Sequence, residues 1–147
     1  MPMPDAVSLI EKLGLVPHPE GGWFRETWRA DHREGERASA SAIYFLLESS
    51  QKSHWHKVDA AEIWLWHSGN AALLSSSDPL DPEVEQVTLG PDVLSGHVAQ
   101  HIIAAGDWQA AEVLPGMHDY ALVSCIVSPG FDFEGFTLAP PEWQPEG

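Results

Sequence analysis

Short apolar runs alternate with turn-forming residues along most of the chain, and only the first segment has helical spacing. Val7, Ile10 and Leu13 recur on one helix face, with Asp5 as a candidate N-cap and Gly14 as a stop. The later pattern predicts strands near 23–30, 40–47, 53–58, 61–68, 71–76, 84–89, 97–104, 108–113, 120–128 and 133–138. We therefore expect an all-β barrel or sandwich with one short N-terminal helix.

Length and composition predict a single globular domain. The chain has 147 residues, of which 44% are hydrophobic and 20% charged, so it can bury a real core. We expect residues 1–147 to form one domain, with 14–139 as the barrel core and the proline-rich 140–147 as a frayed tail. The only cysteine, Cys125, cannot form an internal disulfide, and no signal peptide or membrane-spanning run is visible. These features favour a cytoplasmic protein.

The charge distribution narrows the choice of partners. The formal net charge is −15, and all seven Lys and Arg residues lie in the first 57 positions. Nucleic acids and anionic membranes need clustered Lys and Arg, so we expect neither as a partner. A neutral or singly anionic small molecule is the expected ligand, and most of the acidity serves solubility.

One segment carries most of the candidate chemistry. His54 and His56 stand two positions apart, so on a regular strand both imidazoles leave the same face. Glu62 opens the next predicted strand, and Trp64 and Trp66 continue on its face. If the two strands pair, two imidazoles and one carboxylate converge inside the sheet. Two histidines and one carboxylate can hold a divalent metal while leaving other coordination positions open.

This segment resembles the first signature of the cupin superfamily, in which His-x-His is followed by Glu and then, after six residues, by Gly. Glu62 and Gly69 have that spacing, while the gap between His56 and Glu62 is one residue longer than usual. The second cupin signature is matched loosely at 104–109, where Gln109 stands in place of the usual histidine. The amide oxygen of a glutamine is a weaker ligand for a transition metal than an imidazole.

A narrower resemblance covers nearly the whole chain. Blocks at 15–27, 41–47, 61–64, 106–110 and 127–133 are similar to a branch of small, uncharacterised cupins, the cupin-5 group. The resemblance implies a double-stranded β-helix (a cupin jelly-roll barrel), a homodimer and an interior pocket. It also implies that one divalent transition metal ion (Fe, Mn, Ni, Co or Zn) is a candidate cofactor, with the ligands His54, His56, Glu62 and Gln109. A metal-free polar pocket built from the same side chains is the alternative.

Three functions are compatible with this sequence. The first is a cupin barrel that binds a small polar molecule, of the sugar or carboxylate class, as a metal-dependent or metal-independent enzyme. The second is a non-catalytic binding protein. The third is a metal-free isomerase, because the block at 23–29 faintly resembles nucleotide-sugar 3,5-epimerases. The candidate catalytic residues are His54, His56 and Tyr44, with Tyr120 as another possible acid, and the candidate ligand-binding residues are Arg25, Glu26, Trp64 and Trp66.

Overall fold

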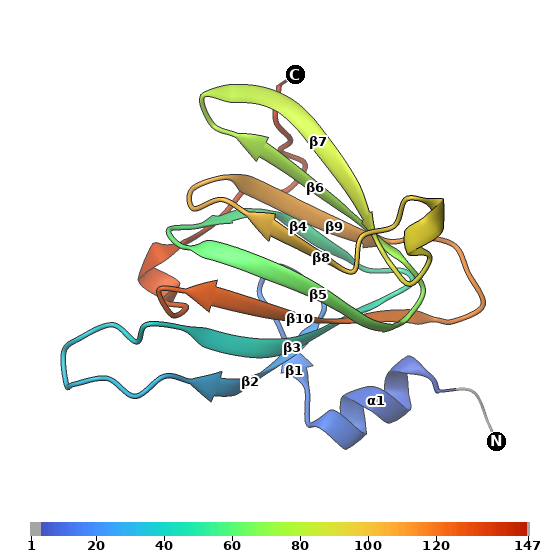
Figure 1. Cartoon of the computed structure of the whole chain (residues 1–147), viewed down its shortest axis with the longest axis horizontal. Helices are drawn as coiled ribbons and strands as arrows, with labels where there is room; N and C mark the ends of the chain where they lie inside the picture. Colours follow the sequence, from blue (N-terminus) through green and yellow to red (C-terminus); the bar gives the residue numbers. More distant parts are fainter. Residues whose placement is uncertain (1–3, 147) are drawn as a thin grey trace.

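A computed structural model describes residues 4–146 as one helix followed by antiparallel strands (Figure 1). The elements are α1 (Ala6–Leu13), β1 (Val16–Pro17), β2 (Trp23–Arg29), β3 (Ser41–Glu48), β4 (Lys52–Val58), β5 (Ala61–Gly69), β6 (Ala72–Asp78), β7 (Asp81–Leu89), η1 (Val93–Ser95), β8 (Gln100–Ile103), β9 (Trp108–Val113), β10 (Tyr120–Ser128), η2 (Phe133–Gly135) and β11 (Phe136–Leu138). The predicted all-β class with one short helix is confirmed. The last predicted strand is shorter than expected, because Phe133–Gly135 form a 3₁₀ turn.

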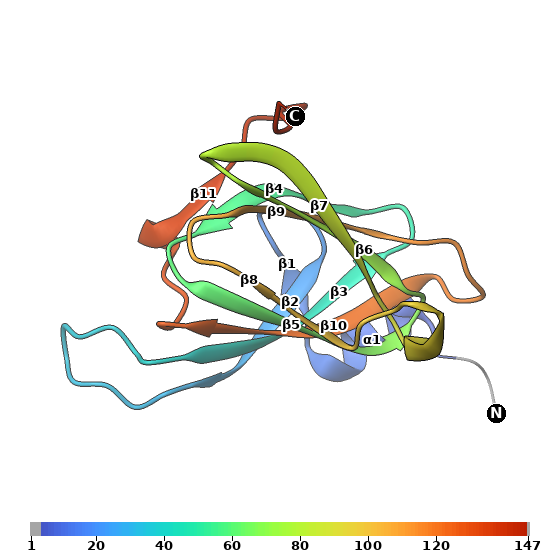
Figure 2. The same ribbon diagram turned by 45° about the horizontal axis from the view of Figure 1, so that its top comes forward.

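The strands form two sheets that face each other (Figure 2). The order in one sheet is β1-β2-β3-β10-β5-β8, and the order in the other is β11-β4-β9-β6-β7. Apolar side chains from both sheets meet between them, including Phe45, Trp64, Leu74, Leu89 and Val123. The opposed inner faces therefore make the core, as alternating strand side chains require.

Helix α1 packs on the outer face of the larger sheet. The Asp5 side chain accepts a hydrogen bond from the backbone N–H of Ser8, and Gly14 ends the helix in the left-handed conformation with φ 68°. Both residues act as the sequence predicts. The helix packs Ala6 against Leu46 and Tyr120, so the barrel interior stays free of it.

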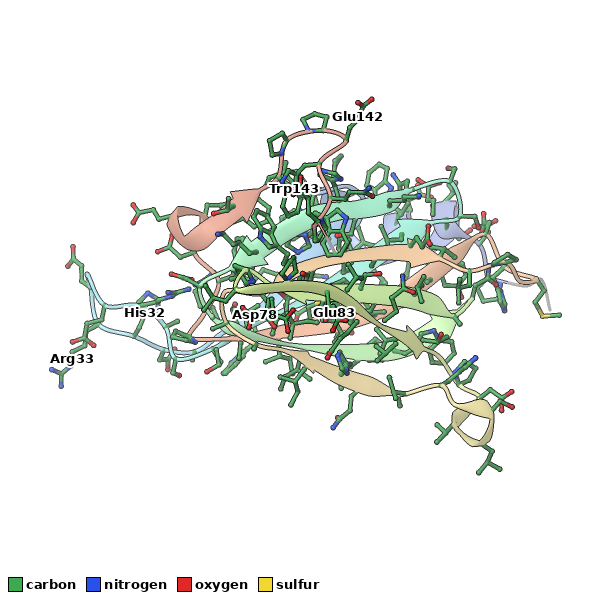
Figure 3. All side chains as sticks on the ribbon, turned by 90° about the horizontal axis from the view of Figure 1, so that it is seen from above. His32, Arg33, Asp78, Glu83, Glu142 and Trp143 are labelled. Atoms are coloured by element: carbon green, nitrogen blue, oxygen red, sulfur yellow. The ribbon has the colours of Figure 1, made fainter. Side chains whose placement is uncertain are left out.

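The C-terminal segment lies against the outer face of the smaller sheet. Trp143 packs onto Trp108 with ring centroids 4.5 Å apart, and Figure 3 shows it over this sheet. The backbone oxygen of Pro140 is 2.9 Å from His54 Nε2. Over residues 4–146, the structure has no helix long and apolar enough to cross a membrane.

Candidate functional site

An irregularity in strand β4 decides which histidine enters the barrel. Ser53 pairs with Ala111 and His56 with Gln109, so three steps on β4 match two on β9. The extra residue breaks the alternation of side chains, and Ser53 and His56 are both buried. His54 instead directs its Nε2 to the backbone oxygen of Pro140. The prediction that His54 and His56 share one face is therefore wrong.

The His56 ring is held in one orientation by its own strand. Its Nδ1 donates to the backbone oxygen of His54 at 2.7 Å, because a carbonyl can only accept. In the neutral ring this leaves Nε2 as the acceptor, and Nε2 lies 3.0 Å from Glu20 Oε2. His56 is 1% exposed. A carboxyl group and an imidazole thus meet out of contact with bulk water.

Glu20 is brought into the barrel by the turn between β1 and β2. Gly21 has φ +107°, and a Cβ there would lie 2.2 Å from the backbone oxygen of Lys52, so only glycine fits. This close approach lets the backbone oxygen of Glu20 accept from His54 N–H at 2.8 Å. The Ser53 hydroxyl donates to Glu20 Oε2, beside the contact with His56.

His18 lies on the other side of the Glu20 carboxyl group. Its Nδ1 accepts the backbone N–H of Glu20 at 3.1 Å and lies 3.3 Å from Glu20 Oε1. The neutral ring therefore carries its proton on Nε2. The ring also contacts Phe24 edge-on, with centroids 4.6 Å apart.

Burial controls the protonation of this cluster. Desolvation raises the pKa of Glu20 to about 8, although the hydrogen bond from Ser53 opposes the change. Desolvation, with a smaller contribution from nearby His56, lowers the pKa of His18 to about 4. It also lowers the pKa of His56. At neutral pH the cluster therefore holds one proton between Glu20 and His56, with His18 uncharged.

Glu62 and Gln109 form a separate hydrogen-bonded chain. Trp64 Nε1 donates to Gln109 Oε1 at 2.8 Å, and Gln109 Nε2 donates to Glu62 Oε1 at 3.0 Å. Burial raises the pKa of Glu62. It also raises the pKa of the Cys125 thiol, which lies beside this carboxyl group. Both the oxygen and the nitrogen of the Gln109 amide are therefore hydrogen-bonded inside the barrel.

The four predicted metal ligands do not fit a metal ion. His54 points to Pro140, the oxygen of Gln109 accepts from Trp64, and of the four only His56 and Glu62 line the inner cavity. Nowhere within residues 4–146 are three His, Cys, Asp or Glu side chains arranged to hold a metal ion. The donor set available here is that of a proton-sharing cluster.

The cluster lies at the bottom of a two-part cavity. The inner part, about 30 Å³, is lined by His18, Glu20, His56 and Glu62 together with apolar side chains. The outer part, about 480 Å³, opens between Arg29 and Arg37. The two parts share Phe24, Ile43 and Phe131 in their walls. The two parts therefore adjoin, and the inner part has room for no more than a small group.

The other predicted site residues are dispersed. Glu26 lines the outer cavity and pairs with Arg29 at 2.5 Å. Arg25 donates to the backbone oxygen of Leu13 beside the helix. Tyr44 packs on the outer face of the larger sheet, as does Tyr120. Trp64 and Trp66 share one face as predicted, and both fill the core.

Three residues of the cluster were not predicted to be functional. His18 and Glu20 belong to a segment whose prolines and glycines indicate a turn, and Ser53 precedes the His-x-His motif. The sequence contains one usable signal, a charged Glu between Pro19 and two glycines. A carboxylate in so rigid a turn has a fixed direction, but only the fold shows that this direction is inward.

Residues 7–139 match the family described as Cupin superfamily (DUF985). The chain belongs to this cupin family. The two facing antiparallel sheets are the cupin jelly roll, which confirms the predicted fold. The chain is similar to the uncharacterized protein YML079W of Saccharomyces cerevisiae, with 29% identity over 160 residues that cover 94% of this chain and 79% of the yeast protein.

Solved structures of similar proteins have the same fold. A hypothetical protein from Leishmania major is 34% identical with a TM-score of 0.84, covering 92% of this cupin and 88% of that chain. Protein SO0799 of Shewanella oneidensis is 33% identical with a TM-score of 0.86. The match covers 93% of this cupin and 85% of the Shewanella chain. An oxalate decarboxylase of Bacillus subtilis, which has Mn(II) centres, is 13% identical with a TM-score of 0.63, and this cupin spans 29% of its length. At that identity the likeness shows the fold alone.

Proposed function

We propose that this cupin binds a small polar molecule in its two-part cavity and that the Glu20–His56 pair moves a proton to and from it. The observation that carries the proposal is the 3.0 Å contact between Glu20 Oε2 and His56 Nε2 at the bottom of the cavity. A buried pair that holds one proton can act as acid or base near neutral pH, which is what general acid–base catalysis requires.

The cavity favours an uncharged or singly charged ligand. Arg29 is paired with Glu26, and Arg37 forms two hydrogen bonds to Asp59, so neither guanidinium is free for a phosphate. Two further acids, Glu36 and Asp132, and one histidine, His32, also line the outer part. A volume of about 480 Å³ lies within the range of small-molecule sites. A sugar or a small carboxylate fits this combination of size and charge better than a nucleotide sugar.

The reaction class that fits the cluster is isomerisation or epimerisation next to a carbonyl group. The His56–Glu20 pair takes a proton from the carbon beside the carbonyl, which leaves an enolate, and then returns a proton to carbon. While the pair holds the abstracted proton, that proton exchanges with solvent. The neutral His18 offers its Nε2–H to the carbonyl oxygen. Atoms and electrons balance within the substrate, so the reaction needs no oxidant and no second substrate.

Proton exchange measured by NMR tests this function directly. Wild-type protein treated with EDTA is incubated in D₂O with a panel of aldoses, ketoses and 2-oxo acids, and loss of the C–H signal is followed. We expect exchange on at least one compound, and we expect Glu20→Gln to reduce it by about 10²-fold or more. His54→Ala is the matched control, because its ring lies outside the cavity, and it should retain the wild-type rate.

Two outcomes would favour the other functions. Exchange that disappears with EDTA and returns with one added transition metal would support a metal-dependent enzyme, against the donor geometry described above. Binding of a sugar or carboxylate without any exchange in the wild type would support a non-catalytic binding protein. In either case the proton-transfer role of Glu20 and His56 would be refuted.

A further inference from the structure

A bulge in strand β2 builds one wall of the outer part of the cavity. Glu26 pairs with Ile43 and Trp28 with Ala42, so two steps on β2 match one step on β3. Across the bulge, residues three positions apart in β2 can leave the same face, which a regular strand does not allow. Glu26 and Arg29 therefore both line the cavity, where they form an ion pair.

The arginines of the outer part hold an aromatic segment in place. Arg29 Nη2 donates to the backbone oxygen of Phe131 at 3.0 Å, and Arg37 Nε donates to the backbone oxygen of Gly130 at 2.7 Å. Each guanidinium is also paired with a carboxylate. These charged groups therefore fix the position of the segment that carries Phe131 and Phe133.

An apolar surface is left uncovered in the outer part. Phe24, Ile43, Phe131 and Phe133 all line it. The rings of Phe131 and Phe133 pack edge to face, with centroids 4.8 Å apart. Phe133 is nevertheless 56% exposed, so the protein covers less than half of this side chain. A ligand with an apolar face that packs on Phe133 would remove this surface from water.

The polar lining of the outer part is rich in hydrogen-bond acceptors. The carboxylates of Glu26, Glu36 and Asp132 line it, and the two lining arginines are already paired with acids. An ionised carboxylate only accepts hydrogen bonds, so it needs a ligand that donates them. A sugar hydroxyl can donate, whereas a carboxylate ligand can only accept and would be repelled by these anionic groups.

We propose that the ligand of this cavity is a neutral sugar whose ring stacks on Phe133, with its hydroxyls directed to the carboxylates of the outer part. A pyranose ring suits such a wall, because one face presents C–H groups to an aromatic ring while hydroxyls project from its rim. The inference rests on the proposed function, since it names the substrate class of the same cavity and selects sugars over small carboxylates. The ring stays in the outer part, and only one small group enters the inner part beside Glu20 and His56.

NMR titration with methyl glycosides tests this binding without any chemistry, because a methyl glycoside has no free carbonyl group. The panel contains methyl pyranosides of neutral hexoses and pentoses, with glucuronate and 2-oxo acids as anionic comparators. We expect at least one neutral glycoside to bind one-to-one and about tenfold or more tighter than any of the anions. Saturation transfer from the aromatic protons of the protein should be strongest on the C–H groups of one ring face.

Two substitutions of Phe133 test the stacking itself. Phe133→Ala should weaken glycoside binding by about fivefold or more, and Phe133→Trp should keep it or tighten it, because an aromatic face is what the ring packs on. Trp28→Ala is the matched control, since Trp28 is an aromatic side chain of similar exposure, 53%, that does not line the cavity. This control should stay within about twofold of the wild type.

The proposal is overturned if no neutral glycoside binds, if an anion binds more tightly, or if Phe133→Ala and Trp28→Ala weaken binding equally. Failure of the proposed proton transfer gives a different result. Glycoside binding that depends on Phe133, without proton exchange on any sugar, would refute the proton transfer and support the sugar site. Exchange on 2-oxo acids that Glu20→Gln abolishes and Phe133→Ala leaves unchanged would refute the sugar site alone.

Discussion

Replacing Glu20 by Gln should remove most of the alkaline pH dependence of stability. Glutamine has nearly the same shape, and its NH₂ group in the place of Oε2 can donate one hydrogen to His56 Nε2 and the other to the Ser53 hydroxyl oxygen. The wild-type Glu20 carboxyl group has a pKa of about 8 in the folded protein, against an ordinary value of 4.5. The native state therefore holds a proton that the unfolded chain releases between these two pH values.

The sign of the effect follows from proton binding. A group whose pKa is raised by folding stabilises the native state fully below its unfolded pKa, and this stabilisation is lost as pH rises to the folded pKa. Between pH 4.5 and 6.5, the lowered pKa values of His18 and His56 act in the opposite direction. Above pH 6.5 this opposition ends. Glu20 then dominates up to pH 8, with Glu62 acting in the same direction.

The expected magnitude is large enough to measure. Each pH unit over which only the native state holds the proton is worth about 1.4 kcal/mol. The wild-type free energy of unfolding should therefore fall by about 2 kcal/mol from pH 6.5 to pH 8. Urea denaturation at several pH values in this interval measures the fall, and Glu34→Gln, at an exposed position, is the control. If Glu20→Gln keeps the wild-type slope, Glu20 does not hold the buried proton.

Other substitutions test the packing around the site, each by urea denaturation at neutral pH. Gln109→Ala should cost about 3 kcal/mol, because it leaves a buried indole N–H and a buried carboxyl group without partners. His56→Ala should cost at least about 2 kcal/mol more than His54→Ala, since only His56 is fully buried. Gly69→Ala should cost more than about 2 kcal/mol, because φ is +90° and the new Cβ would lie 2.3 Å from the backbone oxygen of Tyr120.

Local patterns predicted the elements well because each is governed by neighbouring residues. Asp5 and Gly14 delimit the helix through contacts within one turn, and the alternation at 61–68 places Trp64 and Trp66 in the core. The tryptophans could not be assigned to core or ligand from spacing alone. That choice depends on Gln109, whose side-chain oxygen accepts a hydrogen bond from Trp64, although the two residues are 45 positions apart in the sequence.

The site was harder to predict because it depends on one irregular step in a strand. A regular β4 would place His54 and His56 on one face, as their spacing suggests. The bulge between Ser53 and His56 instead turns Ser53 inward and His54 outward. Residues 53–56 contain no glycine or proline, so nothing in their sequence indicates this bulge.

The same bulge explains why Glu20 belongs to the cluster. Because Ser53 faces inward, its hydroxyl can donate to Glu20 Oε2, and because His54 faces outward, its backbone N–H and oxygen bind Glu20 and His56 respectively. The His-x-His motif thus contributes the imidazole of His56 and the two backbone hydrogen bonds of His54. A carboxyl group from the β1–β2 turn takes the place next to His56 that a second imidazole would have on a regular strand. A pair that shares a proton therefore stands where the sequence predicts metal ligands, and the proposed proton transfer rests on this difference.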